Sequence, residues 1–325
     1  GVTVLEQLAE LVAELVRDDP RRVLLGEDVA DGGMLGLSRA VAADPSLAPR
    51  LVSTPLVPTI LAAHAGGLAA AGMRPIVLLP SVGALTEAVA GLRETAMLSW
   101  RTGGARTAPV LFVAPCGPGF GLGADAGEAP EAALTRIGGL RVLCVGRAQE
   151  AGAMLRAAAE FWLGDEPTVL LLPRSLLLQD LGDEPPVPTL PRPLGASHRV
   201  RSGSAVTVFA WGEAVELAER AVEASGRDAT VVDVVSLSPL DRQGLIDAAK
   251  QTGKIVITHA GPRTGGVGAE LAALFADQAI LHLDAPVITI AGKDVPMPYA
   301  ANLEKLALPN VDEVVEAVKA VTYRD

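Results

Sequence analysis

Short apolar runs alternate with stretches of helical periodicity along almost the whole chain. The runs in the first half, rich in valine, leucine and isoleucine, lie at 22–29, 50–55, 74–80, 108–115, 141–145 and 167–173. Strands buried on both faces have this continuous apolar character, and strands separated by helices form right-handed βαβ units. The sequence therefore predicts an α/β fold in which parallel sheets are covered by helices on both faces.

A segment rich in proline and polar residues, from about Gly182 to Ser204, interrupts this alternation. A second series of apolar runs follows it, with predicted helices near 213–225, 241–251, 266–277 and 312–320. A chain of 325 residues, half of them apolar, is long enough to bury two cores. We predict two three-layer domains with parallel sheets, at 1–185 and 204–325, joined by a linker at 186–203.

Composition argues against several classes of partner and site. The formal net charge of -11, with no basic stripe, argues against nucleic acid as a partner. No apolar run reaches the ~18 residues of a membrane span, and residues 1–19 suggest an acidic amphipathic helix instead of a signal peptide, so we expect a cytoplasmic protein without a membrane partner. With four histidines at unsuitable spacing we predict no metal site, and we expect Cys116 and Cys144 to be buried thiols.

Three loops follow predicted strands, where open parallel sheets bind ligands. Glu27 and Asp28 in "GEDVADGG" form either a functional acid pair or a solvated turn. The glycines of loop 115–132, "PCGPGFGLGADAGEAPEA", either let backbone N–H groups approach a ligand or make a mobile loop. His259 and Arg263 precede a glycine-rich helix start, which indicates either an anion site or close packing of helix on strand.

Motifs spread in order along nearly all of the chain carry a resemblance to a known family. They include "LLGEDV", "STP", "GMRPIV", "APEA", "SLSPLD", "GPRTGGVGAE", "APVITIAGKDVPMPYA" and "LEK". With these motifs the chain resembles the beta subunit of the thiamine-diphosphate-dependent 2-oxo acid dehydrogenases of pyruvate and branched-chain type. The resemblance implies an N-terminal domain that holds the aminopyrimidine of the cofactor and a C-terminal domain of transketolase type. It also implies that a separate alpha subunit binds the diphosphate and its magnesium.

The resemblance breaks down at the residues that would activate the cofactor. The family turn of Thr, Pro, Ile, a small residue and Glu falls on Thr54 to Pro58, so Val57 and Pro58 stand at the small residue and the activating glutamate. Val82 lies in the segment where the family stacks an aromatic ring on the pyrimidine. Proline has no side-chain acceptor and no backbone N–H, so it cannot replace a glutamate in proton transfer.

Two carboxylates remain as candidate catalytic groups. The histidines that the family uses on the substrate side fall on Asp125 and Ala126, and Asp125 could still act as a different acid or base. Glu27 matches an acid that the family uses near the cofactor. Two hypotheses follow: a catalytically degenerate subunit retained for assembly or regulation, and an active thiamine-dependent decarboxylase, dehydrogenase or carboligase with unusual cofactor activation.

The resemblance also implies partners. The predicted helix at 62–72, with Gly66 and Gly67, corresponds to the helix at the twofold beta–beta interface of the family, so we expect a beta dimer and, with an alpha partner, a heterotetramer. Asp284 and the terminal Asp325 match by position an acidic patch that holds a basic domain of the dihydrolipoyl acyltransferase.

Overall fold

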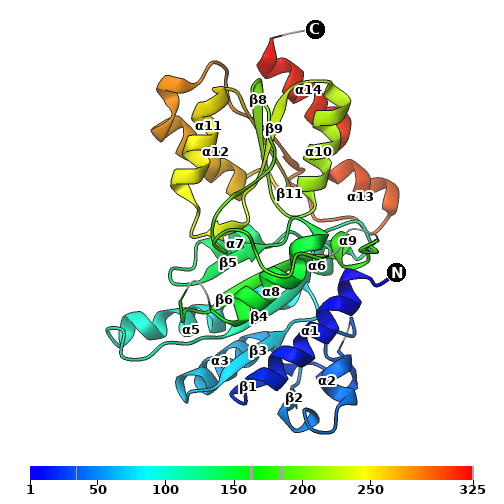
Figure 1. The fold of residues 1–325 in the computed structure, drawn as a ribbon, viewed down its shortest axis with the longest axis vertical. Helices are drawn as coiled ribbons and strands as arrows, with labels where there is room; N and C mark the ends of the chain where they lie inside the picture. Colours follow the sequence, from blue (N-terminus) through cyan, green and yellow to red (C-terminus); the bar gives the residue numbers. More distant parts are fainter. Residues whose placement is uncertain (34, 162–163, 183–185, 324–325) are drawn as a thin grey trace.

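Two α/β domains lie one above the other in the computed structural model, which describes residues 1–33, 35–161, 164–182 and 186–323 (Figure 1). Each domain has one sheet between two layers of helices, as predicted. The N-terminal sheet has the order β10-β5-β6-β4-β3-β1-β2, and the C-terminal sheet has the order β12-β11-β8-β9-β7.

The N-terminal sheet is parallel except at one edge. Its parallel strands are β1 (Arg22–Gly26), β2 (Leu51–Ser53), β3 (Arg74–Leu78), β4 (Leu111–Cys116), β5 (Arg141–Cys144) and β6 (Thr168–Pro173). The seventh strand, β10 (Ser236–Ser238), comes from the second half of the chain and runs antiparallel to β5. A segment from the second predicted domain therefore completes the first sheet.

Each face of this sheet packs on its own set of helices. Apolar side chains on one face join those of α1 (Val4–Asp18), α2 (Arg39–Ala43) and α8 (Ala151–Ala159) in one core cluster. Those on the other face pack on α3 (Pro58–Ala70), α4 (Val82–Glu87), α5 (Val89–Arg101) and α7 (Glu131–Thr135), and this second cluster continues into the C-terminal domain. Two short helices, α6 (Gly123–Ala126) and α9 (Arg174–Leu177), follow β4 and β6 at the domain junction.

The C-terminal domain repeats the architecture with five strands. They are β7 (His198–Arg201), β8 (Val206–Ala210), β9 (Ala229–Asp233), β11 (Ile255–Pro262) and β12 (Ile288–Gly292). The covering helices are α10 (Ala214–Ser225) and α14 (Val311–Thr322) on one face, and α11 (Arg242–Thr252) and α12 (Val267–Gln278) on the other. The short α13 (Ala301–Ala307), which was not predicted, lies near the junction (Figure 1).

Two details differ from the prediction. The last part of the expected linker is a strand, because β7 pairs antiparallel with β9 and brings His198 opposite Asp233. Both sheets are therefore mixed at one edge instead of purely parallel. The linker is also tied to the N-terminal domain, since the buried Glu150 accepts hydrogen bonds from Arg192 at 3.0 and 2.5 Å and lies 3.1 Å from His198 Nδ1. Burial opposes ionisation of this carboxyl, but the hydrogen bonds from His198 and Arg192 lower the pKa of Glu150 to about 2.

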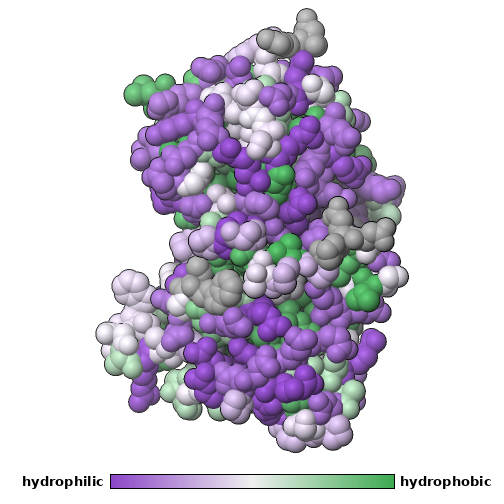
Figure 2. Space-filling model, in the orientation of Figure 1, coloured by the Kyte–Doolittle hydropathy of each residue, from purple (hydrophilic) through white to green (hydrophobic). Residues whose placement is uncertain are grey.

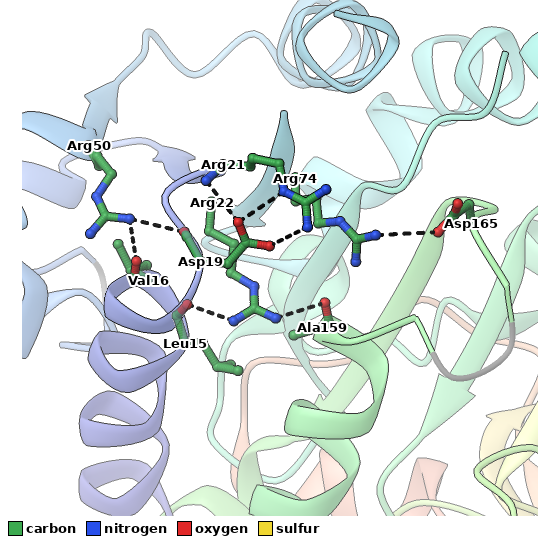
Figure 3. Close-up of polar contacts among 9 residues, drawn as sticks. All are labelled: Leu15, Val16, Asp19, Arg21, Arg22, Arg50, Arg74, Ala159 and Asp165. Atoms are coloured by element: carbon green, nitrogen blue, oxygen red, sulfur yellow. Dashed lines mark hydrogen bonds and ion pairs between the residues drawn. The ribbon is translucent and has the colours of Figure 1, made fainter. Parts of the chain in front are cut away.

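Arginines close the carboxyl end of α1 at the amino-terminal edge of the N-terminal sheet (Figure 3). The last carbonyl groups of a helix have no partner within the helix. Arg22, which is buried, donates to the carbonyls of Leu15 at 2.7 Å and Ala159 at 3.5 Å, so it joins the ends of α1 and α8. Arg50 donates to the Val16 carbonyl in the same way. This end of the domain is therefore held by positive charge placed at helix carboxyl termini.

The outer surface is largely hydrophilic, with apolar residues coming to the surface where the two domains meet (Figure 2). Among the described residues, no helix is both long and apolar enough to cross a membrane.

Candidate active site

The predicted site residues follow neighbouring strands at one edge of the N-terminal sheet. Glu27 follows β1, the turn at 54–57 follows β2, Val82 begins α4 after β3, and Asp125 lies in α6 after β4. Since β4, β3, β1 and β2 are adjacent and parallel, their carboxyl ends meet at this edge. The fold therefore brings the predicted site residues to the carboxyl edge of the sheet, which is where open parallel sheets bind ligands.

The turn at 54–58 is apolar and begins α3. The Thr54 amide donates to the Gly26 carbonyl at 2.9 Å, which holds the turn beside the end of β1. Val57 is 42% exposed and occupies the N-cap position without a side-chain hydrogen bond to the helix, and the buried Pro58 is the first helical residue. No acidic residue occurs in the first turn of α3. The position that aligns with the activating glutamate thus offers neither a carboxylate nor a backbone donor.

Glu27 lies in a small pocket. The side chain is half-buried, and the pocket has a volume of about 20 Å³. Its lining is otherwise glycine, leucine and proline: Gly33, Leu35, Leu37, Leu78, Leu79, Pro80 and Pro115. This space holds about one water molecule, which needs roughly 10 to 15 Å³ of such space. The pocket does not fit a pyrimidine ring, and Glu27 is the only ionisable group in its described lining.

Asp125 packs on the start of α4. A Cβ atom on Gly83 would lie 2.0 Å from Asp125 Oδ1, so the two loops touch only because residue 83 is glycine. Asp125 is exposed, and burial followed by the charge of Asp125 raises the pKa of Glu128. Of Val82, only the backbone at the start of α4 is described. The structure therefore brings Asp125 to the loop after β3, but no contact joins it to Glu27.

The glycine loop at 117–127 binds a carboxylate of the chain itself. The amides of Gly119 and Gly121 donate to the two oxygens of Glu304, at 2.7 and 3.2 Å. Tyr299 covers Gly123 so closely that a Cβ there would lie 2.2 Å from the ring. The sequence left a ligand-binding loop and a mobile loop open, and the structure gives a loop whose amides hold the C-terminal domain.

A buried polar cluster at the junction includes His259. Trp211 donates from Nε1 to Glu131 at 2.9 Å, and its ring stacks on His259 with 4.6 Å between centroids. Burial lowers the pKa of His259 to about 4 and raises that of Glu131, so both groups favour their neutral forms. A Cβ on Gly268 would lie 2.5 Å from His259 Nε2. Of the two interpretations offered for this glycine-rich helix start, close packing accounts for the glycines.

Both cysteines are buried, as predicted. Cys116 ends β4 and Cys144 ends β5, and these strands lie on opposite sides of β6. The hydrogen bond to Cys116 and burial together raise the pKa of the Cys144 thiol, which disfavours the reactive thiolate. Within the described residues, no three His, Cys, Asp or Glu side chains are grouped so that they could hold a metal ion.

The predicted interface and docking residues lie in different surroundings. Gly66 is buried against α5, where an added Cβ would lie 2.7 Å from Thr95 Oγ1, whereas Gly67 is exposed with no atom within 4 Å of the same point. Asp284 is exposed, and its carbonyl accepts a hydrogen bond from the Tyr323 hydroxyl at 3.2 Å. Asp325 lies outside the described residues.

Sequence reasoning did not select two buried acids and one half-buried acid of the C-terminal domain. Glu304 and Asp233 are each at most 3% exposed, and the half-buried Glu213 touches the start of the glycine loop beside Gly117. Burial raises the pKa values of Asp233 and Glu213 to about 7. Only their position next to apolar runs could have indicated burial, and nothing local in the sequence distinguishes them from surface acids.

Comparison with known domain families agrees with the two-domain fold. Residues 1–179 match the pyrimidine-binding domain of transketolase, and residues 195–314 match the transketolase C-terminal domain. A solved split-gene transketolase, described as an inactive beta4 tetramer, superposes with a TM-score of 0.78 over 99% of both chains at 22% identity.

Curated relatives share more of the sequence. The chain is 34% identical to a pyruvate dehydrogenase E1 component subunit beta of Rhizobium meliloti, over 99% of this chain and 70% of that protein. It is 32% identical to the corresponding subunit of Rickettsia felis, over 99% and 98% of the two chains. The mitochondrial subunit beta-2 of Oryza sativa is 31% identical over 99% of this chain and 87% of its own length.

Proposed function

Since the chain belongs to the family of pyruvate dehydrogenase E1 beta subunits, we propose that it is the beta-type subunit of a 2-oxo acid dehydrogenase that has lost cofactor activation. In this proposal the chain is retained for assembly with an alpha subunit or for regulation. The alpha subunit would bring the diphosphate and magnesium sites of thiamine diphosphate.

Pro58 is the observation that carries the proposal. Proton transfer by a positioned carboxylate needs an acceptor within hydrogen-bond reach of the reacting group. At residue 58 the chain has a buried proline at the start of α3, and the adjacent turn residues Pro55, Leu56 and Val57 are exposed and apolar. The small pocket at Glu27 adds a second misfit, because its space takes about one water molecule and not a pyrimidine ring.

A second candidate function is an active thiamine-dependent enzyme with a different proton-transfer group. Asp125 favours it, since this exposed carboxylate packs against the first turn of α4, beside the position of the absent stacking residue at Val82. Glu27 is also present at the end of β1. In this alternative, Asp125 takes over a proton-transfer step on the substrate side.

The proposal includes three partners. A second copy would pack on the open face of α3 at Gly67, where small residues let two helix backbones approach closely. An alpha subunit would complete a heterotetramer across the carboxyl edge of the N-terminal sheet. A dihydrolipoyl acyltransferase would bind near Asp284, which lies beside the described end of the chain at Tyr323.

Exchange of the thiazolium proton of thiamine diphosphate, followed by NMR, tests the proposal in the complex with the alpha subunit of the same organism. We expect exchange near the rate of the free cofactor, and decarboxylation of pyruvate or branched oxo acids near background. The loss of one positioned proton-transfer group typically costs about 10² to 10⁴ in rate.

Pro58→Glu restores a carboxylate at the aligned position, and Pro55→Glu places one on the same turn as the matched control. Faster exchange in Pro58→Glu alone would support the loss of activation at residue 58. Rapid exchange in the unmodified complex would overturn the proposal and favour the active enzyme. The absence of cofactor binding in all three proteins would favour a purely structural subunit.

A further inference from the structure

A strap of the C-terminal domain lies against the glycine loop of the N-terminal domain. The strap, residues 293–310, includes α13, and nearly all its side chains are exposed or half-buried. Only Glu304 and Ala307 are buried within it. A glutamate is an unusual anchor for such a segment, because burying a carboxylate is costly unless hydrogen bonds replace its hydration.

The hydration of Glu304 is replaced by backbone amides from the other domain. Gly119 and Gly121 donate to separate oxygens of the carboxylate, so both oxygens are bonded. Glycine φ values of +107° and +61° turn these amides to the same side of the loop, a conformation that other residues adopt rarely. Hydrogen bonds to an ionised acceptor are about twice as strong as neutral ones.

The further contacts between the glycine loop and the strap are close van der Waals contacts of a ring and of backbone atoms. The Tyr299 ring covers Gly123 while itself remaining largely exposed, and the Tyr299 carbonyl lies 3.0 Å from the point where a Gly121 Cβ would be. Within the strap, the Lys293 amide donates to the Ala307 carbonyl at 2.8 Å, which closes the strap on itself. The charged contact between the strap and the loop is therefore the Glu304 carboxylate.

We propose that Glu304 is a positioning residue that latches the strap to the glycine loop and so fixes the position of Asp125. The loop that Glu304 holds continues directly into α6, which carries Asp125, and Asp125 packs on Gly83. Release of the carboxylate frees the loop and the strap together, while the two sheets keep their own cores. The latch does not depend on whether the chain binds a cofactor.

Hydrogen exchange of the purified full chain, read by mass spectrometry, tests the latch. Glu304→Gln keeps the size of the side chain and removes its charge, and Glu304→Ala removes both oxygens. Glu316→Gln is the matched control, because Glu316 is a 76% exposed glutamate of the same domain, in α14. We expect peptides covering 117–127 and 293–310 to exchange about 10- to 100-fold faster in both Glu304 variants. Strands β4 and β8 should exchange as in the unmodified protein, and the control should change nothing.

Limited digestion with chymotrypsin gives a second measurement, because Phe120 and Tyr299 lie in the two released segments. We expect faster cleavage at both residues in the Glu304 variants. Unchanged exchange of the loop in both variants would overturn the latch. Equal acceleration in every segment would also overturn it, since Glu304 would then support global stability instead of a local contact.

Discussion

The two ends of the N-terminal sheet differ in what their polar groups do. At the amino-terminal end, arginines meet the last carbonyls of α1, and the buried Arg22 joins two helices (Figure 3). At the carboxyl end, the turn after β2 is proline, leucine and valine. Charged residues that serve the fold are thus present at the amino-terminal end, while the first turn of α3, after β2, has no acidic residue. This difference is what the proposed loss of cofactor activation would leave.

The carboxyl end of the N-terminal sheet also has two parts with different surroundings. The turn after β2 is apolar, whereas the part after β5 lies under the second domain and meets a buried acid. Asp233 accepts a hydrogen bond from the Val235 amide at 3.0 Å, and within the described residues its second oxygen has no hydrogen-bond partner. A Cβ on Gly146 would lie 2.2 Å from that oxygen. The difference raises the question whether polar groups matter where they join domains and are dispensable at the apolar turn after β2.

The largest effect is expected from Asp233, as a dependence of stability on pH. Burial raises the pKa of Asp233 from 3.8 to about 7, so the folded chain binds the proton more tightly than the unfolded chain. This contribution to stability is present below about pH 4 and is lost as the pH rises through 7. The charge of Glu150 also raises the pKa of Asp233, whereas those of Arg192 and Arg147 lower it. Between pH 5 and 7.5 we expect the contribution of Asp233 to fall by about 2.5 kcal/mol, at 1.36 kcal/mol per pKa unit.

Urea unfolding at pH values from 5 to 7.5 measures this slope. Asp233→Asn, which cannot ionise, should remove the Asp233 share of the slope, while a share from Glu213 remains because burial also raises the pKa of Glu213 to about 7. Asp312→Asn, at an exposed aspartate, should leave the slope as in the unmodified chain. An unchanged slope in Asp233→Asn would assign the pH dependence to another group.

Arg22 carries the next largest expected effect. Arg22→Met removes the guanidinium that bonds the Leu15 and Ala159 carbonyls and leaves these acceptors buried, so we expect a loss of about 2 kcal/mol in the free energy of unfolding. Arg21→Met is the control, because Arg21 is exposed and pairs with Asp19 next to it. Equal losses in the two variants, measured in urea at one pH, would contradict a special role for the buried arginine.

Much of the fold could be predicted from the sequence, because buried parallel strands have a local signature. The exceptions have physical causes. Strand β10 could not be separated from β9, since the apolar run continues through both and the break depends on Asp233 binding the Val235 amide. Strand β7 has the sequence His-Arg-Val-Arg, which an exposed edge strand tolerates and a buried strand does not. Helix α13 has no apolar stripe, because Glu304 is one of its two buried residues.

Part of the candidate site could likewise be predicted from the sequence, and part could not. The lack of a carboxylate at Pro58 is evident in the sequence, and the resemblance is what makes this position the proposed site of lost activation. The contact of Glu304 with the glycine loop could not, because it joins residues 183 and 185 positions apart. The size of the pocket at Glu27 also depends on segments from four parts of the chain.

Two neighbouring glycines of α3 are expected to respond in opposite directions. Gly66→Ala forces a methyl group against Thr95 Oγ1, which already donates to the Gly91 carbonyl at 2.9 Å, so we expect a loss of about 1 kcal/mol. Gly67→Ala meets no atom of the chain and should gain about 0.5 kcal/mol of helix propensity. Urea unfolding at one protein concentration measures both changes in the free energy of unfolding.

Sedimentation extends this prediction to assembly. If a second copy packs on the open face of α3, Gly67→Leu should shift the beta dimer toward monomer at micromolar concentration. A protein that is monomeric both before and after the change would contradict the proposed beta–beta contact.

The smallest expected effect lies at the apolar turn after β2. Val57 occupies the N-cap position of α3 with a non-helical backbone, φ -126° and ψ 83°, and its side chain cannot accept a hydrogen bond from the first turn of the helix. Serine at an N-cap typically improves helix stability by ~0.5 to 1 kcal/mol over an apolar residue. Val57→Ser should therefore raise the free energy of unfolding by about 0.5 kcal/mol, and Leu56→Ser, at an exposed residue that is not the cap, should change it less. A clear loss of stability in Val57→Ser would mean that the apolar side chain is packed in the assembled protein. The turn would then be an occupied interface instead of a vacated site, and the contrast between the two ends of the sheet would reflect a change of role at residue 57.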